Sequence, residues 1–143
     1  QATCSQFSCL PAAALATLNK LKSVDVPRHL TTISERLRAG LGDLAKQLGL
    51  NIRFSGHPAI TILSFEDPQA SALQTLFTIR MLEQGILAGS GFYASLAHRE
   101  EHVERFLKAS GKVLPEVARA AETGDVLERI PNGVKHSGFS RLT

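Results

Sequence analysis

The sequence contains no tryptophan, one tyrosine and only two cysteines. Because proteins that bind single-stranded nucleic acids stack bases on aromatic side chains, the shortage of Trp and Tyr disfavours that class. Lys and Arg are spread among acidic residues, so the net charge of +3 is not gathered into a basic patch. We therefore expect no nucleic-acid partner.

Cys4 and Cys9 are five residues apart, a spacing that matches neither the CxxC redox motif nor a zinc pattern. Free thiols of a protein in the reducing cytoplasm are the simpler interpretation.

No run of residues approaches the roughly 18 apolar residues of a membrane span, and we see no basic-then-apolar leader. We expect a cytoplasmic protein without a membrane partner. Because the chain begins at Gln1 rather than Met, we interpret it as a fragment or a processed chain.

Apolar periodicity along the 143 residues predicts one domain with helices as its main elements. The predicted helices cover 10–21, 26–48, 70–83 and 99–120. The second is the clearest, because leucine and isoleucine recur at intervals of three and four residues between Asp25, a capping residue, and Gly49. These helices are long enough to cover a small sheet.

Extended segments lie between the predicted helices. Alternating apolar residues in 51–55 and 59–65, separated by the turn Gly56-His57-Pro58, predict two strands joined by a tight connection. A further extended piece is expected at 85–87 and a strand at 92–97. The order predicts an α+β fold, with a small, mostly antiparallel sheet of three or four strands covered by long helices.

The stretch HREEH, from His98 to His102, fits the H-x-x-E-H pattern of some zinc peptidases. Zinc would need both imidazoles on one side of a helix and a third protein ligand. We expect His98 to sit at a strand-to-helix junction and to point toward solvent, and no downstream acid is in position to be the third ligand. Glu100 and Glu101 instead suit a first helical turn, where the helix dipole favours acids. We therefore expect no metal site.

Other candidates for chemistry lack the surrounding motif. Ser55 and Ser90 are loop serines without a G-x-S-x-G elbow, and Gly89 and Gly91 do not continue into a GxGxxG helix start. His57, next to a proline, is interpreted as a turn residue. No catalytic residue is therefore expected among them.

Five segments of the chain form a recognisable series. They are ATCSQFSCLPAAALATLNKL, SERLRAGLGDLAKQLGL, RFSGHPAITILSFEDP, TLFTIRMLEQGILAG and SLAHREEHVERFLKA. In this order they resemble the carboxy-terminal small domain of class III aminotransferases, fold type I pyridoxal-phosphate enzymes, and most closely the glutamate-1-semialdehyde aminomutase branch. The resemblance implies a single domain, 1–143, in which 1–9 connect from a larger upstream domain and 122–143 form an extended tail with a weak helical turn at 125–129.

The resemblance also implies a cofactor, a partner and a substrate class. The complete protein would be a homodimer that uses pyridoxal 5'-phosphate to transfer or shift the amino group of a small amino acid or amine. Thr3 falls where this family has a threonine whose hydroxyl binds the cofactor phosphate in the neighbouring subunit. The family follows that residue with a turn containing Gly or Asn, whereas here Cys4-Ser5-Gln6-Phe7 follow.

The lysine that carries the cofactor in this class of enzyme is expected to be missing from the chain. The six lysines lie on predicted helices or in the tail, among charged or polar neighbours: Lys20, Lys22, Lys46, Lys108, Lys112 and Lys135. The family places the Schiff-base lysine and the pyridinium-binding acid upstream of Gln1, so we expect no catalysis by this chain alone. The alternative is a non-enzymatic α+β module that binds a partner protein through an apolar surface.

Overall fold

The computed structural model describes residues 6–135, with side chains described from Cys9 onward. The described residues form four α-helices, three strands and one 3-10 helix. These are α1 (Gln6–Ser23), α2 (Val26–Gln47), β1 (Ile52–Ser55), β2 (Ile60–Phe65), α3 (Ala70–Glu83), β3 (Gly91–Tyr93), α4 (Glu100–Thr123) and η1 (Val126–Arg129). The strands form one antiparallel sheet in the order β1-β2-β3, which confirms the predicted α+β fold.

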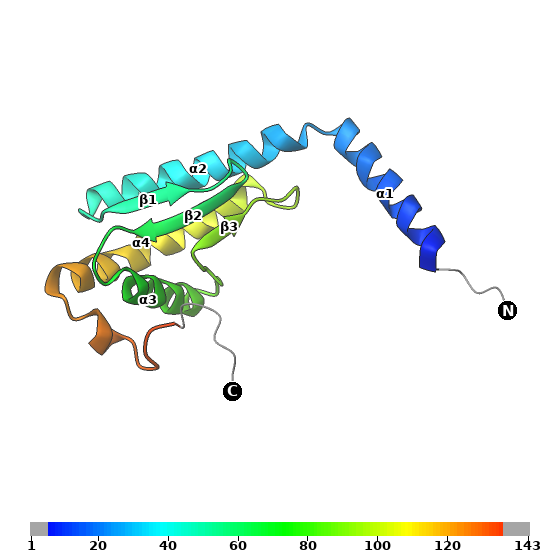
Figure 1. Ribbon diagram of the computed structural model, residues 1–143. Helices are drawn as coiled ribbons and strands as arrows, with labels where there is room; N and C mark the ends of the chain where they lie inside the picture. The colour runs from blue at the N-terminus through cyan, green and yellow to red at the C-terminus, as the bar shows by residue number, and fades with distance from the viewer. Residues whose placement is uncertain (1–5, 136–143) are drawn as a thin grey trace.

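Three helices cover the same side of the sheet. Figure 1 shows α4 behind the sheet, between α2 above and α3 below, while α1 leads away from this body. Both outer helices pack against α4, and both also contact β2. The body of the fold is therefore a two-layer α+β arrangement, and α1 stands outside it.

Local signals in the sequence explain α2. The Asp25 carboxylate accepts a hydrogen bond from the backbone amide of Arg28 at 3.2 Å, and a proline occupies the first helical turn. Ile33, Leu37 and Leu41 are buried along one face. The predicted helix is confirmed, and it ends where Gly49 adopts a φ of 67°, a conformation that glycine reaches without strain.

The hairpin β1–β2 places alternate side chains on opposite faces of the sheet. Phe54 pairs with Leu63 on the face toward the helices, where Phe65 also packs edge-on against Phe77 of α3. On the other face, Ile62 of β2 is partly exposed. This alternation confirms the two predicted strands and gives the sheet one covered and one open face.

The third strand is shorter than predicted. We expected a strand over 92–97, but β3 ends at Tyr93. The backbone amide of Ala94 donates to Ala59 at 3.0 Å, and the chain then turns, with the amide of His98 donating to Ser95 at 3.0 Å. The extended piece expected at 85–87 forms no strand, because the amide of Ile86 closes the end of α3 instead.

The end of the described chain packs against the core. Within 122–135 the chain completes α4, forms η1 where a helical turn was expected, and buries Val126 and Ile130. The backbone amide of Lys135 donates to the Thr75 hydroxyl of α3 at 3.1 Å. Residues 136–143, the rest of the tail predicted to be extended, lie outside the described residues.

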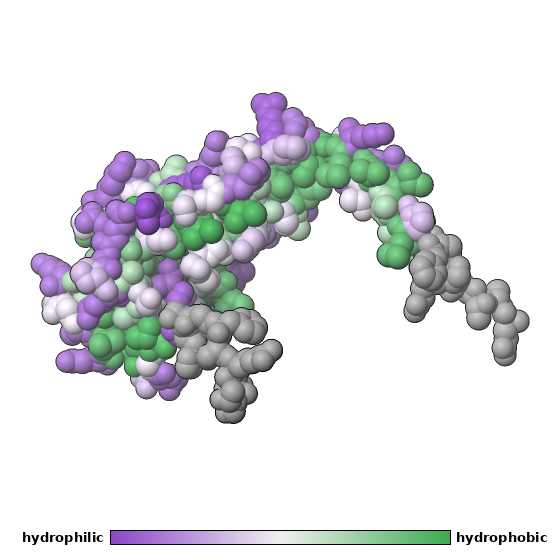
Figure 2. Space-filling model, in the orientation of Figure 1, coloured by the Kyte–Doolittle hydropathy of each residue, from purple (hydrophilic) through white to green (hydrophobic). Residues whose placement is uncertain are grey.

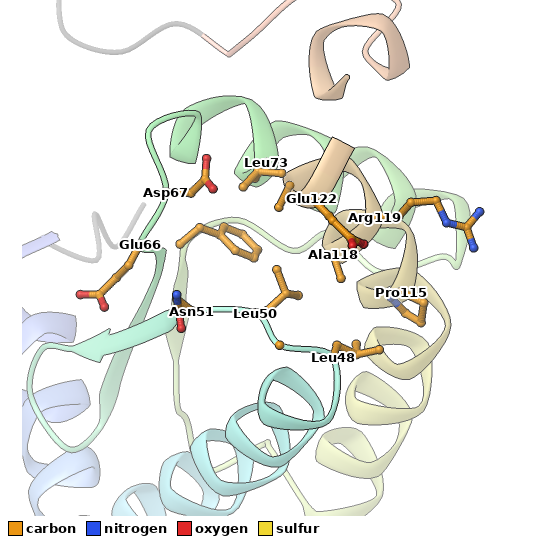
Figure 3. A pocket seen from close by; sticks show the side chains of 13 residues that line it. Leu48, Leu50, Asn51, Glu66, Asp67, Leu73, Pro115, Ala118, Arg119 and Glu122 are labelled. Carbon is orange, nitrogen blue, oxygen red and sulfur yellow. The ribbon is translucent and has the colours of Figure 1, made fainter. Parts of the chain in front are cut away.

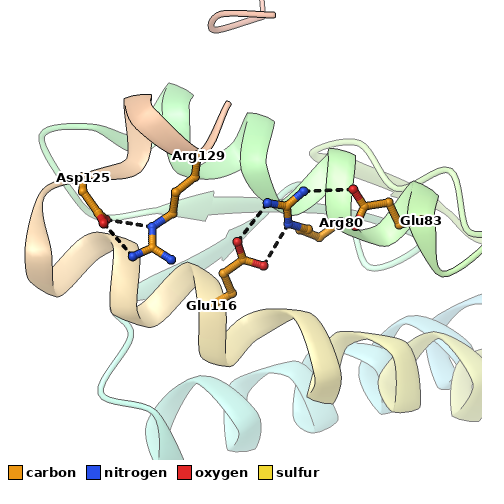
Figure 4. Close-up of polar contacts among 5 residues, drawn as sticks. All are labelled: Arg80, Glu83, Glu116, Asp125 and Arg129. Carbon is orange, nitrogen blue, oxygen red and sulfur yellow. Dashed lines mark hydrogen bonds and ion pairs between the residues drawn. The ribbon is translucent and has the colours of Figure 1, made fainter. Parts of the chain in front are cut away.

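Figure 4 shows three ion pairs, one of which connects α3 to α4. Arg80 of α3 pairs with Glu116 of α4 at 2.8 Å and with Glu83 of its own helix at 2.9 Å. Arg129 pairs with Asp125 at 2.6 Å within the segment that forms η1.

No helix among the described residues is long and apolar enough to cross a lipid bilayer.

Candidate functional site

Thr3, the expected contact of a cofactor phosphate, lies outside the described residues. The described chain begins three residues later with α1, so α1 is the element that directly follows the predicted contact. The role of Thr3 therefore stays a prediction.

His98 is half-buried and does not point toward solvent as expected. Its ring lies 5.0 Å from the ring of Phe92, and its Nδ1 accepts a hydrogen bond from the backbone amide of Ser95 at 3.0 Å. The predicted position between strand and helix is confirmed, since α4 begins at Glu100. The predicted orientation was wrong because it assumed helical geometry, whereas the loop that carries His98 folds back on β3. Its backbone oxygen accepts a hydrogen bond from Nε2 of His29 at 3.0 Å, which connects this loop to α2.

His102 closes the first turn of α4. Its Nδ1 accepts a hydrogen bond from the backbone amide of Arg99 at 3.0 Å, so the side chain satisfies a donor that the helix leaves free. His98 and His102 lie side by side, with ring centroids 6.2 Å apart. Within the described part of the chain no group of three His, Cys, Asp or Glu side chains could hold a metal ion.

A cavity of about 500 Å³ lies beside these two histidines. Its apolar walls come from the loop after α3, from β3 and from the first half of α4, and its polar rim consists of His98, His102 and Arg105. The lining includes no lysine and no acid. This cavity therefore cannot provide the lysine and the pyridinium-binding acid that a pyridoxal-phosphate site requires.

A second cavity, of about 700 Å³, lies between the α2–β1 connection, the end of β2 and the second half of α4 (Figure 3). Leu50, Phe65 and Leu73 are among its apolar lining. Figure 3 shows that the charged ends of Glu66 and Arg119 point away from this apolar centre. Its lining includes three acids, Glu66, Asp67 and Glu122, but no lysine, so it lacks the group that would carry the cofactor.

All six lysines of the chain are exposed. Lys46 lines a third cavity, of about 630 Å³, beside α2 and β1, but its side chain is exposed. A lysine that forms a Schiff base is activated by desolvation or by a neighbouring cation in an enclosed site. The described residues therefore do not assemble a lysine-centred site for pyridoxal phosphate.

Apolar surface is concentrated on α1 (Figure 2). Every residue from Cys9 to Ser23 is exposed, including four leucines whose exposed fractions range from 45% to 69%. The sequence could not identify this surface, because an Ala- and Leu-rich helix has the same composition whether it is covered or bare.

The architecture of the described residues identifies the fold. A three-stranded antiparallel sheet covered by long helices matches the carboxy-terminal domain of fold type I pyridoxal-phosphate enzymes. Two solved structures share the fold. The FumI protein of Sphingopyxis sp. MTA144, in its PLP internal aldimine form, has a TM-score of 0.70 at 23% identity over 76% of this chain and 27% of its own. An omega-transaminase from Sphaerobacter thermophilus has a TM-score of 0.57 at 18% identity over 64% and 24%.

Sequence relatives point in the same direction. A glutamate-1-semialdehyde 2,1-aminomutase from Thermomicrobium roseum is 31% identical over 121 residues, which cover 75% of this chain and 28% of the aminomutase. Glutamate-1-semialdehyde 2,1-aminomutase 2 from Brevibacillus brevis is 30% identical over 116 residues, covering 69% of this chain and 26% of that enzyme. No family model matches the chain. The chain is similar to part of these aminomutases, and the match spans little more than a quarter of the curated relatives' length.

Proposed function

We propose that the chain is the carboxy-terminal domain of a pyridoxal-phosphate-dependent enzyme that transfers or shifts an amino group. The observation that carries the proposal is the unequal coverage of the relatives. Three quarters of this chain matches an aminomutase, but the match covers only 28% of that enzyme. A complete enzyme would therefore need a further, larger part, which in this proposal holds the lysine and most of the cofactor site.

The pockets of the described residues support this division. Of the three cavities described above, only the one beside α2 and β1 has a lysine in its lining, and that lysine is exposed like the other five. When bound, the cofactor supplies an electron sink for the substrate's α-carbon. In this proposal the domain itself covers the larger part of the enzyme and closes one side of the substrate cleft.

Thr3 is the one residue of this chain that we propose as a cofactor contact. Its hydroxyl would donate a hydrogen bond to a phosphate oxygen in the neighbouring subunit of a homodimer. A hydrogen bond to an ionised phosphate is shorter and stronger than one between neutral groups. The substrate would be a small amino acid or amine, and the enzyme would work in the cytoplasm.

The test uses the protein expressed together with the sequence encoded upstream of Gln1 in the same reading frame. We expect this longer protein to bind pyridoxal phosphate, with the absorbance of a lysine-bound cofactor, and to transfer or shift an amino group on glutamate-1-semialdehyde or an ω-amine. The 143-residue chain should do neither. If the 143-residue chain alone develops that absorbance and activity, or if the longer protein never does, the proposal is wrong.

The Thr3 contact needs its own variants in the longer protein. Thr3→Ala is expected to weaken cofactor binding by about tenfold, since one charge-assisted hydrogen bond is lost. Thr3→Ser keeps the hydroxyl and should bind as the unmodified protein does. Equal affinities of the Ala and unmodified proteins would remove Thr3 from the site and leave the rest of the proposal intact.

A non-enzymatic interaction module is the second candidate, favoured by the exposed leucines of α1. Such a module would bind a separate protein through α1 and would need no cofactor. The absorbance experiment separates the two candidates, because only the enzyme gains a cofactor when the upstream sequence is present.

A further inference from the structure

The leucines of α1 form a stripe without a covering partner in the described structure. Leu10, Leu15, Leu18 and Leu21 are 69%, 60%, 52% and 45% exposed. At about 100° per residue their side chains fall within an arc of about 140°, so they share one side of the helix. Figure 1 shows α1 leading away from the body, and Figure 2 shows hydrophobic residues along its length.

The side-chain hydrogen bonds that the structure describes in α1, from Cys9 onward, are all local. The Thr17 hydroxyl donates to the backbone oxygen of Ala13 at 2.9 Å, and the Ser23 hydroxyl donates to that of Lys20 at 3.0 Å. Pro11 lies inside the helix, where it removes one backbone hydrogen bond. An isolated helix of this length is marginal in water, because most helix stability in proteins comes from packing of an apolar face. By itself, α1 lacks that packing.

The rest of the described chain has the packing that α1 lacks. Leu37 and Leu41 of α2 and Val103 and Val117 of α4 are at most 3% exposed within one continuous core. That core does not include any of the α1 residues from Cys9 to Ser23, whose side chains the structure describes. Residues 26–135 therefore have their own source of stability, and α1 depends on something else.

We propose that α1 is a docking helix, which becomes stably helical when its leucine stripe is covered by the upstream domain of the same polypeptide. This inference rests on the proposed function for the existence of that domain. The greater length of the relatives supplies the occupant, since the match covers only 28% of the aminomutase. As the first element of the chain, α1 is also the element nearest in sequence to anything upstream.

Charge disfavours a second copy of α1 as the occupant. The helix contains Lys20 and Lys22 and no acidic residue. Two copies packed along their stripes would bring only positive charges to the rim, and neither copy offers a carboxylate to pair with them. A surface with acidic residues around an apolar groove is the better complement, and this is the chemistry expected of the upstream domain where it receives α1.

Hydrogen exchange measured on two proteins tests the proposal. In the 143-residue chain, amides of 12–22 should exchange within about tenfold of the unfolded rate, whereas those of 33–45 and 103–120 are strongly protected. In the longer protein that includes the upstream sequence, the amides of 12–22 should slow by at least about 100-fold. Unprotected α1 amides in the longer protein would overturn the proposal. Full protection of these amides in the dilute 143-residue chain would also overturn it. Protection that increases with the concentration of the 143-residue chain would overturn it as well, because the leucine stripe would then be covered by a second copy.

Paired variants show whether the stripe itself is responsible. Leu15→Ser with Leu18→Ser, made in the longer protein, should abolish most of the added protection of α1. Ala12→Ser with Ala16→Ser places the same hydroxyls on the opposite side of the helix and should preserve it. If both pairs behave alike, the protection does not come from the leucine stripe and the proposal is wrong.

Cofactor absorbance recorded on the same longer protein tests the proposed enzyme separately from the docking helix. Protected α1 amides without the absorbance of a lysine-bound cofactor would leave the docking helix standing and contradict the proposed enzyme. The absorbance together with unprotected α1 amides would support the enzyme and overturn the docking helix.

Discussion

The guanidinium of Arg80 in α3 binds both carboxylate oxygens of Glu116 in α4. Its Nε donates to Oε2 at 2.8 Å and its Nη2 donates to Oε1 at 3.0 Å. These hydrogen bonds lower the pKa of the Glu116 carboxyl below its ordinary value of 4.5 and raise the pKa of Arg80. Because both side chains are largely covered, the pair is a stronger link between the two helices than an exposed ion pair would be.

Glu116→Gln should lower the free energy of unfolding by about 1–2 kcal/mol, because the guanidinium keeps its position but loses a charged, two-oxygen acceptor. Urea denaturation at neutral pH measures this loss. Glu83→Gln is the control, since Glu83 is more exposed and accepts only one hydrogen bond from Arg80. The control should cost less than about 0.5 kcal/mol. Equal losses in the two variants would show that the bidentate geometry contributes nothing special.

Acid should weaken the fold through its carboxylates. Hydrogen bonds from Arg129 and Thr123 lower the pKa of Asp125 from 3.8 to about 2. A carboxyl whose pKa is lower in the folded state stabilises the fold at pH values above its unfolded pKa and loses that contribution as the pH falls through the folded one. With Glu116 shifted in the same direction, the free energy of unfolding should fall between pH 4.5 and about 2.

Variants of the Asp125–Arg129 pair test the origin of this acid dependence. Asp125→Asn and Arg129→Gln should each flatten the pH profile of unfolding below pH 4, because each removes the same pair. The double variant should flatten it no further, as expected for two residues that act together. An unchanged slope in Asp125→Asn would place the acid sensitivity elsewhere in the protein.

Elements with local signals could be predicted from the sequence, and elements fixed by distant contacts could not. Asp25 and the repeat of leucines are sufficient to define α2. The end of β3 depends instead on a hydrogen bond from Ala94 to Ala59, 35 positions earlier, and on the turn that brings His98 back over Phe92. No pattern within 92–98 distinguishes that turn from a longer strand.

Some features of the candidate site could likewise be predicted from the sequence, and others could not. The sequence predicted a chain without a buried lysine, and the described structure shows every lysine exposed. It also predicted Thr3 as a cofactor contact, which lies outside the described residues. The exposure of α1 from Cys9 to Ser23 could not be predicted, because it depends on the position of the helix relative to the core rather than on its own composition.

Ser34 of α2 is fully buried, and no hydrogen-bond partner for its hydroxyl is found among the described residues. Ser34→Ala should raise the free energy of unfolding by about 1 kcal/mol, because it removes a buried polar group that gains nothing from the fold. Thermal unfolding of the 143-residue chain measures the change.

Ser110 of α4 is the matched control, since it is equally buried but its hydroxyl donates to the sulfur of Met81 at 3.9 Å. Both serines lie inside helices, so the gain in helix propensity on changing to alanine is the same and cancels in the comparison. Ser34→Ala should therefore stabilise the protein more than Ser110→Ala. The reverse order would indicate that the Ser34 hydroxyl does have a partner, such as a buried water molecule.

Gly56 shapes the turn between β1 and β2. Its φ is 96°, and a Cβ atom at this position would collide with the backbone oxygen of Ile60. Gly56→Ala should therefore lower the free energy of unfolding by about 2 kcal/mol, measured by urea denaturation, because alanine is strained at this φ and the turn cannot move without breaking the hairpin.

Gly42 gives the opposite expectation and serves as the control. It lies inside α2, where a new Cβ would meet only Cε2 of Phe54, at an ordinary contact distance of 3.8 Å. Gly42→Ala should raise the free energy of unfolding by about 0.5–1 kcal/mol, since alanine loses less backbone freedom than glycine when the helix forms. If both variants destabilise the protein equally, backbone strain at Gly56 is not the cause. Destabilisation by Gly56→Ala alone would show that the turn depends on a conformation that only glycine adopts freely.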